Sequence, residues 1–123
     1  MNKDLVSHYE HINPFTTKDG SIIRELMHPA SHQVTRQSLA EATVGVGGKT
    51  LLHRHLRSEE LYFITQGHGV MTLGDQHFKV SRGQTVCIAP GTAHCIENVG
   101  SEPLIVLCSC APAYRDDDTQ ILE

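Results

Sequence analysis

The sequence lacks the features that direct a chain to a membrane, to export or to nucleic acid. Nowhere do 18 apolar residues follow one another, and the N-terminal stretch MNKDLVSHYE has no apolar core of a signal peptide. The 10 lysine and arginine residues form no cluster and are outnumbered by 14 acidic residues, so the basic stripe typical of nucleic-acid binding is missing. We therefore expect a soluble, cytoplasmic protein with no membrane and no nucleic-acid partner.

The four cysteines lack the paired C-x-x-C elements of a zinc knuckle. They are Cys87, Cys95, Cys108 and Cys110. Their even number does not by itself make a disulfide framework, so reduced thiols are expected. Cys108 and Cys110 would share one face of a strand, which permits a redox or metal role without supporting one.

Beyond Gly47, no segment keeps a helical period of apolar residues for three turns. Short β-prone runs follow one another instead, and glycine or proline separates them every 7 to 10 residues. The expected strands cover 49–55, 60–66, 69–73, 76–80, 84–88, 93–99 and 103–110, after two earlier ones in 21–28 and 35–44. The pattern predicts an all-β sandwich or barrel with little helix.

The length of 123 residues fits one domain. Residues 1–18 show little periodicity and are expected to form an N-terminal arm, and residues 19–112 the barrel. The closing RDDDTQILE carries three consecutive aspartates, so residues 113–123 are expected to be a solvated tail.

The stretch LLHRHLRSEELYFITQGHG carries the strongest chemical signal. On a strand, His53 and His55 would point to the same face, where two imidazoles can converge on one ion. A tight connection can then return the carboxylate of Glu60 beside them, and His94 offers a fourth ligand after a Pro-Gly turn. Such a set suits divalent manganese, iron, cobalt, nickel, copper or zinc.

The spacing of this stretch also matches a family motif. Glycine, five residues, His-any-His, four residues, glutamate, six residues and glycine correspond to Gly47, His53, His55, Glu60 and Gly67. This order resembles the first motif of the cupin superfamily at every position. Glu59 is the rival carboxylate, but only Glu60 is separated from the closing glycine by six residues, so Glu59 is expected to face solvent.

A second stretch, residues 83–98, resembles the second cupin motif. Its positions are Gly83, Gly91, His94 and Asn98, and the one departure is Ala89, where the motif has a proline. The two motifs are 15 residues apart, as in small single-domain cupins of the mannose-6-phosphate isomerase-like or oxalate decarboxylase-like kind. The resemblance implies a double-stranded antiparallel β-helix, or jelly-roll barrel.

By the same resemblance, the barrel holds one divalent transition metal per chain, manganese, iron, nickel or zinc, on His53, His55, Glu60 and His94. It also implies a small-molecule ligand in the barrel and a homodimer. The expected function is that of a metal-dependent enzyme on a small organic metabolite, of dioxygenase, decarboxylase, isomerase or lyase type. The alternative is a non-catalytic small-molecule-binding or sensor protein, in which the metal and the ligand are held without turnover.

A general base would distinguish these two functions, and the sequence offers only two candidates besides the ligands. Tyr62 and Ile64 alternate with Glu60 on its expected strand, so they should point to the same face and line the pocket. Ile96 and Asn98 likewise should share the inward face of His94. Glu41 is the other candidate, and its placement depends on the register of its strand.

Overall fold

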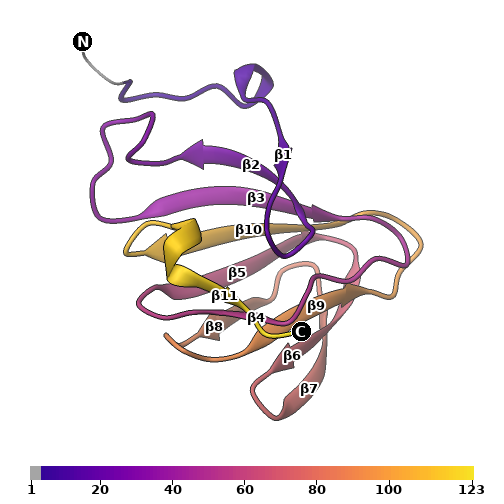
Figure 1. Cartoon of the computed structure of the whole chain (residues 1–123). Helices are drawn as coiled ribbons and strands as arrows, with labels where there is room; N and C mark the ends of the chain where they lie inside the picture. The colour runs from indigo at the N-terminus through magenta and orange to yellow at the C-terminus, as the bar shows by residue number, and fades with distance from the viewer. Residues whose placement is uncertain (1–3) are drawn as a thin grey trace.

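The structure, a computed structural model, describes residues 4–123 and consists of two facing antiparallel β-sheets (Figure 1). The six-stranded sheet has the order β1-β2-β3-β10-β5-β8, and the five-stranded sheet the order β11-β4-β9-β6-β7. The strands of the first sheet are β1 (Phe15–Thr16), β2 (Ile22–Met27), β3 (Ser38–Val44), β5 (Glu59–Gln66), β8 (Thr85–Ile88) and β10 (Leu104–Ala111). Those of the second are β4 (His53–His55), β6 (His68–Leu73), β7 (Gln76–Ser81), β9 (His94–Asn98) and β11 (Thr119–Ile121).

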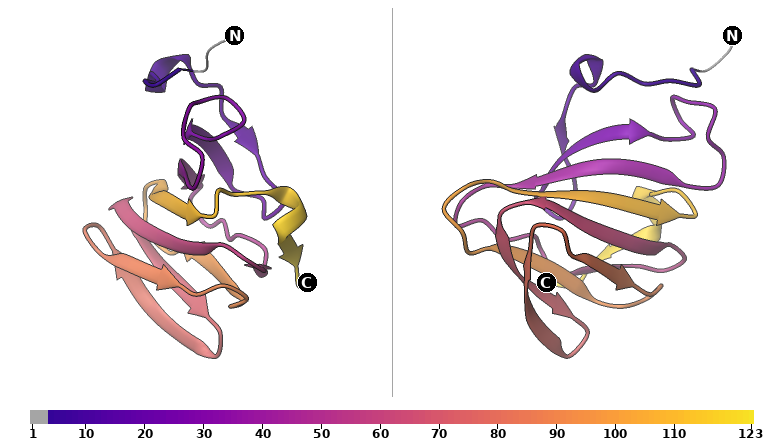
Figure 2. Two further views of the ribbon diagram at one scale, coloured as in Figure 1. Left: turned by 90° about the vertical axis from the view of Figure 1, so that its left-hand side faces the viewer. Right: turned by 180° about the vertical axis from the view of Figure 1, so that it is seen from behind.

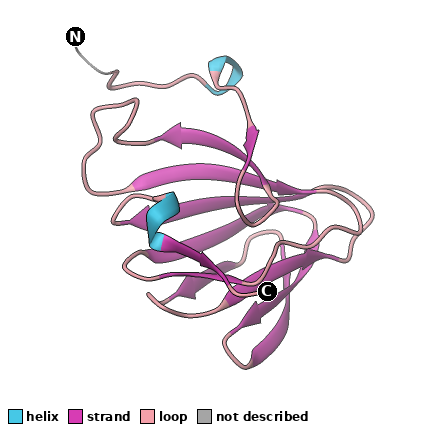
Figure 3. Ribbon diagram, in the orientation of Figure 1, coloured by secondary structure: helices cyan, strands magenta, loops and turns pink. Residues whose placement is uncertain are grey.

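Helix is confined, in the described residues, to two single 3-10 turns, η1 (Tyr9–His11) and η2 (Asp116–Asp118) (Figure 3). None of the helical segments of the described chain is long and apolar enough to cross a membrane. The predicted all-β class and the double-stranded antiparallel barrel are confirmed.

The alternation of side chains along the strands places the core between the two sheets. In β10, every second residue from Leu104 to Cys110 is buried, and β5 buries Glu60, Tyr62 and Ile64 while their neighbours Leu61 and Phe63 stay exposed. The fully buried apolar side chains are Ile64, Met71, Ile88, Leu104 and Val106. Figure 2 shows the fold from the side in its left panel and from behind in its right panel. Apolar packing therefore fills much of the barrel and leaves its histidine-bearing end to polar groups.

The strands lie close to where the sequence predicts them, with one exception. Of the segment 49–55, only His53–His55 forms a regular strand. The residues before it contact β9 only at isolated positions. Lys49 forms an isolated bridge with Glu97, and the amide of Thr50 donates a hydrogen bond to the carbonyl of Ile96. β4 is thus short, and it begins at its first histidine.

Both ends of the chain take part in the sheets. β1 pairs with β2, and β11 pairs with β4 in the register Thr119 to His55. The side chain of Asp118 is buried and accepts hydrogen bonds from the amides of Arg57 and Ser58. Part of the segment expected as a solvated tail therefore supports the strand that carries two of the candidate ligands.

Candidate metal centre

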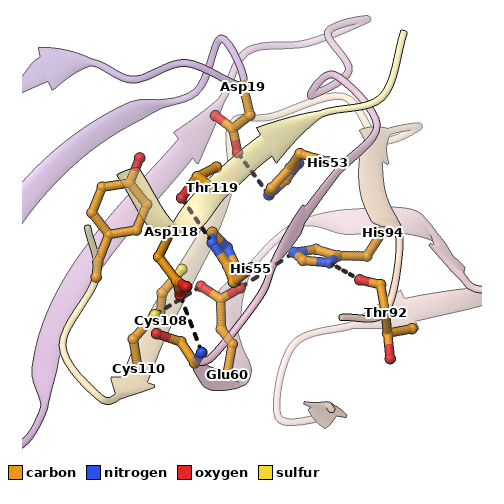
Figure 4. Close-up of polar contacts among 12 residues, drawn as sticks. Asp19, His53, His55, Glu60, Thr92, His94, Cys108, Cys110, Asp118 and Thr119 are labelled. Atoms are coloured by element: carbon orange, nitrogen blue, oxygen red, sulfur yellow. Dashed lines mark hydrogen bonds and ion pairs between the residues drawn. The ribbon is translucent and has the colours of Figure 1, made fainter. Parts of the chain in front are cut away.

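Three histidines meet on the inner face of the five-stranded sheet (Figure 4). His53 and His55 are the two inward residues of β4, and His94 opens β9 directly opposite His53 in the antiparallel register. All three are buried, and one ligand nitrogen of each lies within 4.8 Å of the other two. Arg54, between the two histidines of β4, points outward and donates to the side chain of Gln120.

Backbone carbonyls fix the tautomers of two of these rings. His53 Nδ1 lies 2.7 Å from the carbonyl oxygen of Leu51, and His94 Nδ1 lies 2.9 Å from that of Thr92. A carbonyl oxygen only accepts, so each Nδ1 must carry the proton. In the neutral ring, Nε2 then has a free lone pair, which is the form that binds a metal.

The third ring is fixed by a hydroxyl group of β11. His55 Nδ1 lies 2.9 Å from Thr119 Oγ1, and that hydroxyl donates its own proton to the carbonyl of Arg115 at 2.9 Å. Its oxygen therefore accepts from His55, which again protonates Nδ1 and leaves Nε2 free. The C-terminal strand thus sets the tautomer of a candidate ligand.

The carboxylate of Glu60 completes the cluster from the opposite sheet. Its Oε1 lies 3.2 Å from His55 Nε2 and 3.3 Å from His94 Nε2. Neither approach has hydrogen-bond geometry, and both Glu60 Oε1 and His94 Nε2 are buried without a hydrogen-bond partner among the described residues. Buried polar atoms normally find partners. A lone pair of nitrogen facing a carboxylate oxygen is satisfied by a cation between them, so the donor set fits a divalent metal ion.

The electrostatics of the cluster favour the metal-binding protonation states. Burial raises the pKa of Glu60, but His55 and His94, in the protonated form of these rings, outweigh burial and hold this pKa at about 2. Burial, and then the neighbouring His94, lower the pKa of His53. At neutral pH the carboxylate is therefore ionised and His53 is neutral, as coordination requires.

A cavity adjoins this cluster on the inner face of the six-stranded sheet. It is open to solvent, the empty space in and around it amounts to about 450 Å³, and Glu60 forms part of its wall. Small apolar groups, hydroxyl groups and one further carboxylate, Glu25, line the rest, and no lysine or arginine does so in the described chain. One buried oxygen of Glu25, Oε1, has no hydrogen-bond partner among the described residues, and burial raises the pKa of this carboxyl group.

The two candidate bases differ in position. Tyr62 lines the cavity, and its ring centroid lies 5.9 Å from that of His94. Burial raises the pKa of its hydroxyl well above the usual value, so this group stays protonated and serves as a donor. Glu41 lies on the outer side of β3 and accepts a hydrogen bond from the hydroxyl of Tyr9, away from the histidines, so the expectation of Glu41 as a base of this site is wrong.

The remaining expectations for the strands near the site agree with the structure. Ile64, Ile96 and Asn98 are buried, and Glu59 is exposed. Cys108 and Cys110 share the inner face of β10, and all four cysteines are free thiols.

Two carboxylates near the site were missed by the sequence reasoning. Glu25 alternates in the sequence with Ser21 and Ile23, which also line the cavity, and that alternation signals its inward position. Asp19 precedes Gly20 in a turn, and its Oδ2 lies 3.5 Å from His53 Nε2. No spacing signal connects Asp19 with His53, because a tertiary contact brings them together.

Comparison with known proteins agrees with this geometry. The family model described as the cupin domain matches residues 40–110. The uncharacterized protein MJ1618 of Methanocaldococcus jannaschii is 53% identical over 121 residues, which are 98% of this chain and 97% of that protein. A mannose-1-phosphate guanylyltransferase of Escherichia coli is 33% identical over 86 residues, which cover 70% of this chain but only 18% of the enzyme.

Solved structures share the fold. An oxalate decarboxylase of Lactobacillus farciminis in complex with formate has a TM-score of 0.77 at 25% identity, over 94% of this chain and 35% of that chain. The nucleoside dehydratase Pac13 of Streptomyces has a TM-score of 0.79 at 16% identity, over 98% of this chain and 92% of that chain. The matched family domain spans both motifs and all three histidines, and the chain therefore belongs to the cupin family.

Proposed function

We propose that this cupin is a mononuclear metal-dependent enzyme that acts on a small organic molecule bound in the cavity beside Glu60. The observation that carries the proposal is a pair of buried atoms, Glu60 Oε1 and His94 Nε2, which lie 3.3 Å apart and have no hydrogen-bond partner in the part of the chain that the structure describes. The Nδ1 protons of the cluster are fixed. His53, His55, His94 and Glu60 would hold the ion. When bound, a divalent transition metal supplies a Lewis acid, or a redox centre, next to the cavity.

The walls of the cavity favour one class of substrate. Phosphate and dicarboxylate groups are usually recognised by arginine or lysine, and the described residues that line the cavity include neither. Glu25 and Tyr62 offer an acceptor and a donor instead. A neutral, hydroxyl-bearing molecule fits this lining better than oxalate or a phosphosugar. The likeness to a nucleoside dehydratase points in the same direction.

The chain itself would bind and orient such a substrate. Oε1 of Glu25, which has no partner among the described residues, would accept a hydrogen bond from a hydroxyl group of the substrate, and Tyr62 of β5 would donate one. Ala40 and Ala42 of β3 are buried and give the cavity an apolar wall, which would exclude water when a substrate is bound. Exclusion of water strengthens the polar contacts at a reacting centre.

The test combines metal content with turnover. Protein reconstituted without oxygen with Mn²⁺, Fe²⁺, Ni²⁺ or Zn²⁺ is desalted, and bound metal is measured by mass spectrometry for the wild type, His55→Ala and Glu59→Gln. The wild type and Glu59→Gln, whose changed residue is exposed, should retain about one ion per chain, and His55→Ala should lose most of it.

Each loaded form is then incubated with neutral sugars and nucleosides, with dicarboxylates and with sugar phosphates, and the products are analysed by mass spectrometry. We expect metal-dependent conversion among the neutral compounds that is absent in His55→Ala. A wild type that takes up none of the four metals contradicts the metal site. Metal uptake with binding but no conversion favours the non-catalytic alternative, and faster conversion of the phosphorylated compounds contradicts the assignment of the substrate class.

A further inference from the structure

Asp19 lies outside both cupin motifs, yet its carboxylate is held against the histidine cluster. The residue lies in the loop between β1 and β2, and its side chain is only 14% exposed. Its Oδ1 accepts three hydrogen bonds, from Thr17 Oγ1 at 2.8 Å, from the amide of Ser21 at 2.9 Å and from Ser21 Oγ at 2.6 Å. The other oxygen, Oδ2, is turned toward His53 Nε2 at 3.5 Å (Figure 4).

The loop is also attached to His53 through the backbone. The amide of Leu51 donates to the carbonyl of Asp19 at 2.8 Å, and the carbonyl of Leu51 accepts from His53 Nδ1 at 2.7 Å. The same residue therefore positions the imidazole and the loop that carries the carboxylate. Hydrogen bonds to Asp19 Oδ1 and to His53 Nδ1 thus hold the carboxylate and the ring so that Asp19 Oδ2 faces His53 Nε2.

The contact repeats the one that Glu60 makes on the other side of the cluster. Because the carbonyl of Leu51 fixes the proton on Nδ1, neutral His53 presents a lone pair at Nε2 to an anionic oxygen. Neighbouring ligands of an octahedral ion with bonds of about 2.1 Å are about 3.0 Å apart. The 3.2 and 3.3 Å approaches of Glu60 to His55 and His94 are close to this value, and the approach of Asp19 to His53 is 3.5 Å. Asp19 makes no such contact with His55 or His94 among the described residues, so its carboxylate would move toward the ion on binding.

We propose that Asp19 is a fifth protein ligand of the metal ion, a proposal that rests on the metal site proposed above. Three neutral imidazoles and two carboxylates then neutralise the charge of a divalent ion. The added carboxylate raises the affinity for hard, octahedral ions such as Mn²⁺ relative to Cu²⁺ and Zn²⁺. Only one position of an octahedral ion stays open, so a substrate binds the ion through a single atom and depends on the cavity wall for the rest of its recognition.

Two variants of Asp19 and one control test this proposal with Mn²⁺ as the probe. Asp19→Asn keeps an oxygen for the three donors of the turn but loses the charge, and Asp19→Ala removes both oxygens. Glu59→Gln makes the same charge change as Asp19→Asn at an exposed position next to Glu60. The dissociation constant is measured by competition with a chelator, and the number of water molecules on bound Mn²⁺ by pulsed EPR in H₂¹⁷O.

The wild type and Glu59→Gln should show one bound water molecule, and Asp19→Ala should show two. Both Asp19 variants should bind Mn²⁺ at least tenfold more weakly, a loss of the size seen when ligand shells are disturbed. Thermal unfolding identifies any variant that fails to fold. Should Asp19→Ala fail to fold, the affinity of Asp19→Asn for Mn²⁺ decides the test.

Unchanged affinity in folded Asp19→Asn, or two water molecules already in the wild type, would overturn the role of Asp19 and leave the four-ligand site intact. A wild type that binds no Mn²⁺, Fe²⁺, Ni²⁺ or Zn²⁺ would overturn the metal site itself, and the role of Asp19 with it.

Discussion

Loading the site with Mn²⁺ should raise the thermal unfolding temperature of the chain, because the candidate ligands join the two sheets. Glu60 belongs to β5 of the six-stranded sheet, and the histidines belong to β4 and β9 of the other. β4 has three residues and pairs with β9 only through His53 and His94. An ion held by residues of both sheets would bind the folded state and not the unfolded chain.

The size of the effect follows from linkage. Free Mn²⁺ at one hundred times its dissociation constant stabilises the folded state by about 2.7 kcal/mol. The unfolding entropy of a chain of 123 residues is about 0.26 kcal/mol per kelvin, from a value of about 2.1 cal/mol/K per residue. The two numbers together give a rise of about 10 °C in the unfolding temperature.

Differential scanning calorimetry in the presence of chelator and of Mn²⁺ measures this shift for the wild type, Glu60→Gln and Glu59→Gln. Glu60→Gln removes the charged ligand, so most of the shift should disappear at the same total metal concentration. Glu59→Gln should keep the full shift. An equal rise in Glu60→Gln, or no rise in the wild type, would refute the reasoning, since non-specific binding or an absent site would then explain the data.

Three further outcomes are expected. In the native protein, iodoacetamide at pH 8 should alkylate only the exposed Cys87, which mass spectrometry of peptides would show. The other three thiols are buried, and burial raises the pKa of Cys108 and Cys110. Gly67→Ala should lower the free energy of unfolding by about 1–3 kcal/mol in urea titrations, since the residue has φ of 94° and the added Cβ would lie 3.0 Å from a backbone carbonyl oxygen. Asn98→Ala should cost about 2–4 kcal/mol in the same assay, because the buried side chain makes three hydrogen bonds to backbone groups; a loss below 0.5 kcal/mol would contradict the importance of these bonds.

The three histidines could be located from the sequence because their placement depends on local geometry. His53 and His55 share a face of β4 by simple alternation, and His94 is the first residue of β9, a strand within the second motif. Once two strands carry three imidazoles at motif spacing, the register of β4 against β9 brings them together.

The contributions of the chain ends could not be predicted, because they depend on contacts between distant segments. Asp19 reaches His53 only because the amide of Leu51 binds the backbone of the N-terminal loop. Thr119 orients His55 from a strand of three residues, which is too short to show a period, and it follows three aspartates that suggest a solvated tail. The predicted homodimer stays a prediction.

The most direct test of the metal centre is a crystal structure of the protein grown with Mn²⁺ and recorded above and below the manganese absorption edge. The account predicts one strong anomalous peak per chain, in bonding contact with Nε2 of His53, His55 and His94 and with a carboxylate oxygen of Glu60. An anomalous map without a peak at this cluster, from protein saturated with Mn²⁺, would contradict it.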